Sequence, residues 1–292
     1  MSSATLLQFL FSGLTNGALY AFVALGFAIT YSSSGVVNFS QGQSVMVGGI
    51  VAASLNTDFS VPVLPAMLLG VAAAAIVGLI TGRFLILPLL RIGEFNLILV
   101  TLGVGVVCEA AAILIWGTDP WALPSLLSLS PLRISGASLS VDSLTIIGMT
   151  IMTLVAFEAF MRFTRWGRAM RATSIDRTVA SSLGINVRLT IMLSFIISAA
   201  FGGLAGALLT PLVATGAQVG LMMTMKGFTA AVLGGISSPV GAVAGGFLLG
   251  LIEAFAGAFV SSTYQNSIGL AVLIVLLMVR PEGLFTFALR KA

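Results

Sequence analysis

The stretch RFTRWGRAMRATSIDRTVASSLGINVR, residues 162–188, decides how this chain is organised. It carries six of the chain's eleven arginines against a single acid, Asp176. Apolar segments long enough to cross a bilayer lie on both sides of it. Because positive charge between membrane spans collects on the cytoplasmic face, we predict that this loop is cytoplasmic.

The inner part of this loop is predicted to form a short amphipathic helix from Ile175 to Leu183. Ser174 is placed to cap its start, Asp176 lies in the first turn, where the helix dipole favours an acid, and Gly184 supplies a left-handed residue just past the end. The helical spacing gives one apolar edge, made of Ile175, Val179, Ala180 and Leu183. Such a helix either rests on lipid or meets a partner. A partner is favoured, because the edge is small and most of the charges precede the helix.

The composition is that of an integral membrane protein. Of 292 residues, 58% are hydrophobic and 8% are charged, whereas a soluble domain carries about 25% charged residues. We therefore expect one all-α polytopic membrane domain covering 1–292. With one cysteine, Cys108, and no histidine, the chain offers no disulfide framework and no metal cluster, and we expect no cofactor. The net charge of +4 is concentrated on one face and does not indicate nucleic-acid binding.

Hydropathy divides the chain into eight or nine spans, including broken or re-entrant segments. Seven are predicted at about residues 5–31, 36–55, 61–82, 95–117, 142–161, 189–210 and 265–279. The region 222–260 holds either two further spans or a re-entrant hairpin. Residues 118–141, which contain three prolines, are predicted to be an outer loop.

The basic residues predict the orientation. Eleven of the thirteen lysines and arginines fall on the same side under this threading: Arg83, Arg91, the six of the basic loop, Arg280, Arg290 and Lys291. That side is cytoplasmic, so the C-terminus is expected inside and the N-terminus outside.

The second span begins with an unusually polar sequence, GVVNFSQGQSVMVGG, residues 35–49. Polar groups among glycines inside a membrane segment indicate broken backbone that lines a cavity. Residues predicted to line the substrate pathway here are Asn38, Ser40, Gln41 and Gln43. A second glycine-interrupted stretch, 234–250, lies in the opposite half of the chain, which suggests internal pseudo-symmetry with a pathway between the halves.

Three acids lie within predicted spans. Glu158 precedes Arg162 by four residues, so we expect a local ion pair. Glu109 and Glu253 have no such partner in the sequence. Each is a candidate for the pathway or a gate, with interhelical hydrogen bonding as the alternative. The chain has no phosphate-binding loop, zinc-protease motif or nucleophile elbow, so we predict that it is not an enzyme.

Four segments together resemble the permeases of the branched-chain amino acid ABC importers, specifically the shorter, LivH-type subunit. They are GVVNFSQGQSVMVGG, GRAMRATSIDRTVASSLGIN, FTAAVLGGISSPVGAVAGGFLLGLIEA and LMVRPEGLF. The sugar permeases of the same superfamily typically carry an acidic GIDLSVG where this chain has residues 35–42, GVVNFSQG. The lack of that acid favours the amino-acid branch.

The resemblance implies a type II-like ABC importer permease fold in the bacterial inner membrane. The expected partners are two cytoplasmic ATPase subunits that hydrolyse ATP, a second, longer permease subunit or a self-copy, a periplasmic substrate-binding protein and membrane lipid. The pathway would lie between the two permease subunits. The basic loop 162–188 would then be the ATPase-coupling element, with Ala172, Asp176, Ala180, Leu183 and Gly184 as its coupling residues.

Two alternatives remain open at this point, and a third, a structural membrane subunit without a pathway, is disfavoured. The same family resemblance also fits importers of urea, amides or aromatic acids. A stand-alone secondary transporter or channel would need its intramembrane charges arranged as an ion path. A structural membrane subunit would not need the polar, glycine-broken segment.

Overall fold

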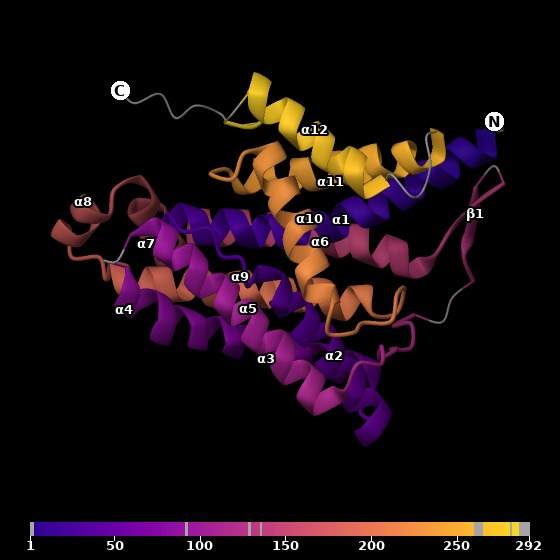
Figure 1. Cartoon of the computed structure of the whole chain (residues 1–292), viewed down its shortest axis with the longest axis horizontal. Helices are drawn as coiled ribbons and strands as arrows, with labels where there is room; N and C mark the ends of the chain where they lie inside the picture. Colours follow the sequence, from indigo (N-terminus) through magenta and orange to yellow (C-terminus); the bar gives the residue numbers. More distant parts are fainter. Residues whose placement is uncertain are drawn as a thin grey trace.

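The computed structural model describes residues 3–90, 93–127, 130–134, 136–259, 265–280 and 282–285, and these are mostly helical (Figure 1). Arg91, Arg290 and Lys291, which were expected on the inner face, lie outside the described residues. The helices are α1 (Ser3–Ser34), α2 (Gln41–Phe59), α3 (Val63–Ile80), the π-helical turn η1 (Thr81–Ile86), α4 (Leu87–Leu89), α5 (Glu94–Trp116), α6 (Val141–Phe163), α7 (Arg165–Ile175), α8 (Arg177–Ser182), α9 (Val187–Leu209), α10 (Val219–Gly234), α11 (Pro239–Phe259) and α12 (Gln265–Val279). A short antiparallel hairpin pairs β1 (Leu132–Ile134) with β2 (Ala137–Leu139).

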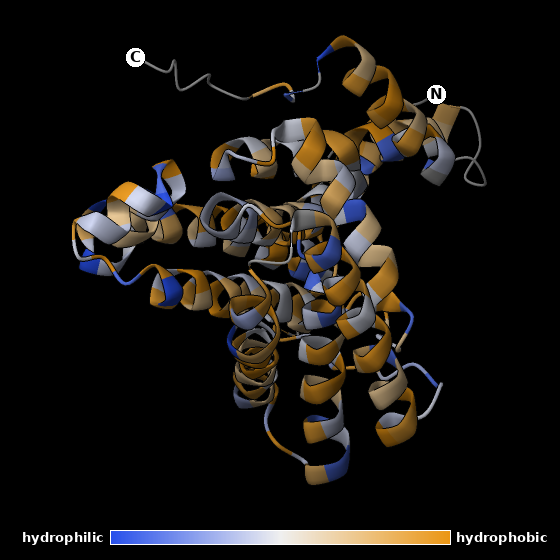
Figure 2. Ribbon diagram, turned by 60° about the vertical axis from the view of Figure 1, so that its left-hand side comes forward, coloured by the Kyte–Doolittle hydropathy of each residue, from blue (hydrophilic) through white to orange (hydrophobic). Residues whose placement is uncertain are grey.

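Six helices in the described part of the chain are long and apolar enough to cross a membrane: α1, α3 continued through η1 and α4, α5, α6, α9 and α11. Each predicted span contains a helix, and Figure 2 shows hydrophobic residues along most of their length. The ambiguous region 222–260 consists of two helices, α10 and α11. At about 1.5 Å per residue, α10 would be about 24 Å long, which is less than a hydrocarbon core of about 30 Å.

The centre of the bundle is α1, which packs along α11 and also against α9 and α10. The contact with α11 is close because both helices present glycines. A Cβ atom built on Gly17 would lie 2.8 Å from the Cα of Phe247, and one built on Gly13 would lie 3.0 Å from the Cα of Leu251. Small residues allow two membrane helices to approach until their backbones touch. The glycines at four-residue spacing in α1 therefore serve helix packing.

Contacts near the two termini of α1 and between neighbouring loops define two ends of the bundle. At one end, the hydroxyl of Ser32 donates to the carbonyl of Ser237, and Ser32, Ser174 and Ser237 line one small cavity. At the other end, Ser138 N–H donates to the Gln8 side chain, and Trp121 pairs with Thr215. Figure 1 shows α7 and α8 at the first end and the N-terminus and β1 at the second. The bundle thus separates the basic loop from the predicted outer loop.

Candidate translocation cavity and inner-face surface

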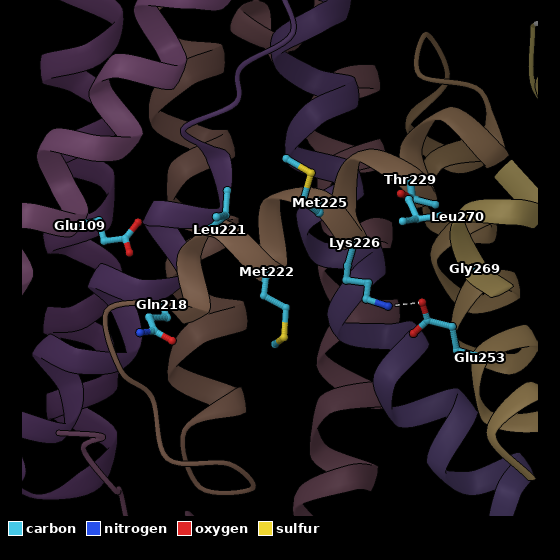
Figure 3. A pocket seen from close by; sticks show the side chains of 10 residues that line it. All are labelled: Glu109, Gln218, Leu221, Met222, Met225, Lys226, Thr229, Glu253, Gly269 and Leu270. Carbon is cyan, nitrogen blue, oxygen red and sulfur yellow. Dashed lines mark hydrogen bonds and ion pairs between the residues drawn. The ribbon is translucent and has the colours of Figure 1, made fainter. Parts of the chain in front are cut away.

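A cavity of about 520 Å³ opens between α5, α10, α11 and α12 (Figure 3). Its wall combines apolar, polar and ionisable residues. The described lining residues are Glu109, Gln218, Leu221, Met222, Met225, Lys226, Thr229, Glu253, Gly269 and Leu270. Glu109 and Glu253 were predicted independently as pathway residues, and the fold brings both to this one cavity. Its volume and its mixed lining are typical of a small-molecule site.

The buried carboxylate of Glu253 has two partners. Lys226 forms an ion pair with it, and the Tyr20 hydroxyl donates a hydrogen bond of 2.9 Å to it. The side chain of Glu253 is only 1% exposed and that of Lys226 is 13% exposed. The Lys226 ammonium also lies 5.8 Å from the centre of the Tyr20 ring. Glu253 therefore makes the interhelical contacts that were the alternative to a pathway role, and it lines the cavity as well.

Lys226 was not predicted as the partner of Glu253. The two residues are 27 positions apart and lie on different helices. A signal was available, because a lysine inside an apolar helix needs a counter-charge in a medium of low dielectric constant. Glu158, by contrast, forms the predicted local ion pair, with its Oε2 3.6 Å from Nε of Arg162.

Glu109 differs from Glu253 in having no hydrogen-bond or ion-pair partner within the described part of the chain. It lies in the interior of α5, is half-buried, and faces the cavity (Figure 3). An unpaired carboxylate is costly at membrane depth unless it meets water, a ligand or another subunit.

The polar residues at the start of α2 stabilise a break between α1 and α2. The Asn38 side-chain oxygen accepts hydrogen bonds from the backbone N–H and the hydroxyl of Ser40, at 3.2 and 2.7 Å. Gln41 is fully buried and its amide donates to the carbonyl of Ser198, near the middle of α9. The break therefore lies at the depth of the centre of α9, inside protein, as non-helical backbone in a membrane must.

Threonines from two other helices complete the hydrogen bonding of this break. The Phe39 N–H donates to Thr101 of α5, and the Gly42 N–H donates to Thr224 of α10, both at 3.1 Å. These threonines accept hydrogen bonds from backbone N–H groups that have no partner within a helix. The break therefore connects α2 directly to α5 and α10, which form two walls of the cavity.

Gln43 lies just behind the cavity wall. It is 3% exposed. Its side-chain oxygen is the one buried side-chain nitrogen or oxygen atom in the described residues that has no hydrogen-bond partner. It packs against Gly220 of α10, and its amide nitrogen is 3.7 Å from where a Cβ of Gly105 would lie. Gly105 precedes Glu109 by one helical turn in α5, so Gln43 contacts α5 one turn from Glu109.

The basic loop, residues 162–188, forms two helices where one was predicted. Thr164 caps α7 through the Gly167 N–H at 3.0 Å, and α7 runs on to Ile175. The predicted capping by Ser174 is wrong, because its hydroxyl donates to the carbonyl of Arg171. Asp176 is the cap of α8 and accepts from two N–H groups, at 2.7 and 3.0 Å. A carboxylate that accepts two backbone donors is a strong N-cap.

The predicted apolar edge of this loop is divided in the structure. Ile175, Val179 and Leu183 are 75%, 55% and 75% exposed, whereas Ala180 is 1% exposed. Ala180 therefore packs inside the chain and is not available at the surface. Gly184 has φ of +81°, the left-handed conformation that was predicted. We call Ile175, Val179 and Leu183 the tip patch.

Ala172, the remaining residue that was predicted to take part in coupling, lies in the last turn of α7. The backbone carbonyl of Ala172 accepts from the Asp176 N–H at 3.2 Å, at the junction of α7 and α8. The hydroxyls of Thr173 and Thr190 lie 3.1 Å apart and hold α7 to α9. The tip patch is thus carried on a loop that is anchored to a membrane-length helix.

Taken together, the apolar helices, the buried break and the cavity define a helical membrane transport protein. Residues 9–279 match the protein family described as "Branched-chain amino acid transport system / permease component". The chain belongs to this family. The resemblance found in the four sequence segments is therefore confirmed.

Relatives from different organisms are similar over nearly the whole chain. The "High-affinity branched-chain amino acid transport system permease protein LivH" of Salmonella typhimurium is 34% identical, over 95% of this chain and 94% of that protein. The protein BraD of Pseudomonas aeruginosa, with the same description, is 31% identical over 95% of each. A "Probable branched-chain amino acid transport permease protein LivH" of Methanocaldococcus jannaschii is 29% identical, over 91% of this chain and 88% of that protein.

Proposed function

We propose that this chain is a permease subunit of an ATP-driven importer and forms part of the pathway for branched-chain amino acids. The observation that carries the proposal is the cavity: in a chain of this family, a space large enough for an amino acid has both ionisable groups and an apolar wall. An amino acid presents the complementary chemistry, two charged groups and an aliphatic side chain. The same family resemblance leaves urea, amides and aromatic acids as alternative substrates.

The permease would have a type II-like fold in the inner membrane, with eight or nine spans including broken or re-entrant segments. Its N-terminus would lie outside and its C-terminus inside. The separation of the basic loop from the 118–141 loop at opposite ends of the bundle supports this arrangement.

The energy for transport would come from two ATPase subunits that contact the inner face. The tip patch supports this, because three large apolar side chains are exposed on a loop that is otherwise rich in arginine. Ala172, Asp176, Ala180 and Gly184 would act by shaping the loop, and Leu183 by direct contact. Conformational change in an ATPase can drive this chain only through contacts that differ between the two states.

A second permease subunit, longer than this chain or a second copy of it, would close the pathway on the open side of the cavity. A periplasmic binding protein would deliver the substrate. Within this arrangement Glu109 and Glu253 line the pathway directly. Asn38, Ser40, Gln41 and Gln43 support it through the break between α1 and α2.

The test is ATP-dependent uptake in proteoliposomes. The chain would be co-purified with its ATPases and second permease subunit, reconstituted, and supplied with binding protein and radiolabelled leucine. The proposal expects leucine accumulation that requires both ATP and binding protein. Uptake driven by an ion gradient without ATP would instead identify a stand-alone secondary transporter. ATP-dependent uptake of urea or an amide, but not leucine, would identify the alternative substrates.

A further inference from the structure

The charges of the cavity do not balance. Among the described residues, three ionisable side chains line it, and the ion pair between Lys226 and Glu253 neutralises two of them. The third, Glu109, has no partner within the described residues. The described part of the cavity wall therefore carries one carboxylate without a counter-charge, which favours a positively charged group.

The arrangement of the lining residues places this charge at one end. Figure 3 shows Glu109 and Gln218 at one end of the cavity and the Lys226–Glu253 pair at the other. Between them lie the side chains of Leu221 and Met222, with Met225 beside them. Methionine side chains adapt their shape to differing aliphatic groups.

We propose that the Glu109 carboxylate binds the α-ammonium group of the amino acid in this cavity, with the aliphatic side chain lying on Leu221, Met222 and Met225. The inference rests on the proposed function and specifies the chemistry of its substrate. Glu253 is unavailable for this role, because Lys226 and Tyr20 already occupy its carboxylate. A charge-assisted hydrogen bond to Glu109 discriminates between compounds that carry an ammonium group and neutral or anionic compounds that lack one.

This binding mode predicts which compounds compete for the cavity. Leucine and leucinamide both carry an ammonium group on the same aliphatic skeleton. The 2-oxo acid of leucine keeps the skeleton and the carboxylate but lacks the ammonium group, and urea lacks both the charge and the skeleton. The first pair binds at Glu109, and the second pair does not.

The direct test is chemical modification of Glu109 in the assembled importer, without transport. A hydrophobic carbodiimide reacts with carboxyl groups in apolar surroundings, and peptide mass spectrometry measures the rate at Glu109. Leucine and leucinamide are expected to slow modification several-fold, and the 2-oxo acid and urea to leave it unchanged. Equal protection by the 2-oxo acid would overturn the inference. So would an unreactive Glu109 in the assembled importer, which would mean that another subunit neutralises it.

A kinetic test uses Glu109→Gln, with Glu158→Gln as the matched control outside the cavity. Loss of a charged hydrogen bond should raise the KM for leucine uptake by about tenfold or more. The control removes a partly exposed ion pair, and its KM should stay within about twofold. An unchanged KM in Glu109→Gln would contradict the inference.

The two tests separate this inference from the proposed function. ATP-dependent leucine uptake together with equal protection by the 2-oxo acid refutes the role of Glu109 and leaves the importer proposal intact. Selective protection by ammonium compounds without ATP-dependent uptake refutes the importer proposal and supports the binding site.

Discussion

Lys226 and Glu253 form an ion pair inside the helix bundle, although they are 27 positions apart in the chain and lie on neighbouring helices, α10 and α11. The Tyr20 hydroxyl joins α1 to the same pair. Three helices that line or support the cavity are therefore held together by one charged cluster. We therefore expect that removal of this cluster chiefly destabilises the fold.

The first prediction concerns this pair. Lys226→Met should destabilise the protein by about 3–5 kcal/mol, because it leaves the Glu253 carboxylate buried without its counter-charge. The double variant Lys226→Met, Glu253→Gln should recover most of the loss. Thermal unfolding in detergent measures both. A double variant that is no more stable than Lys226→Met alone would show that the ion pair does not determine the stability.

The second prediction concerns the break between α1 and α2. Thr224→Val keeps the side-chain shape but removes the acceptor for the Gly42 N–H. The unsatisfied donor should cost about 1–3 kcal/mol. Thr229→Val in the same helix is the control, since Thr229 makes no hydrogen bond to the break. Equal melting temperatures for the two variants would contradict the structural role of Thr224.

A related prediction tests the pathway role of the break. Gln41→Ala and Asn38→Ala together should reduce leucine uptake while the assembled complex is still recovered on purification. Gln41 is fully buried and binds α9, so the expected mechanism is altered support of the cavity. Unchanged transport in the double variant would exclude these residues from the pathway and its support.

The tip patch predicts where the ATPases bind. Leu183→Asp should abolish ATPase capture in a pull-down and leave membrane insertion intact, because the side chain is 75% exposed. Leu183→Met keeps the apolar contact and serves as the control. Ala180→Trp would be a poorer test, since Ala180 is buried within the loop and bulk there disrupts the loop itself. Normal capture and normal transport in Leu183→Asp would show that the coupling surface lies elsewhere.

The last prediction concerns orientation. In a Cys108→Ser background, a cysteine at Ser174 should react with an impermeant thiol reagent only after the cells are opened. A cysteine at Thr118 should react on intact cells. Both positions are exposed, whereas Ser125 is partly buried and binds Asp142. Labelling of Ser174→Cys on intact cells would reverse the assigned topology.

The sequence by itself determined the features that depend on nearby residues. Hydropathy over about 20 residues located the helices, the i to i+4 spacing identified the Glu158–Arg162 pair, and a glycine after a short helix predicted the left-handed residue at Gly184. Four local segments also identified the family. The structural predictions among these succeed because each depends on interactions within a few helical turns.

Only the tertiary structure decided which distant side chains meet. It paired Lys226 with Glu253, brought Glu109 to the same cavity and bound Gln41 to the middle of α9. It also turned Ala180 inward and made Asp176 the cap that the sequence had assigned to Ser174. Local sequence patterns cannot decide which distant side chains become partners, because this depends on how each helix is rotated and placed against the others. In a bundle packed through glycines, side-chain partners follow from backbone contact between segments far apart in the chain.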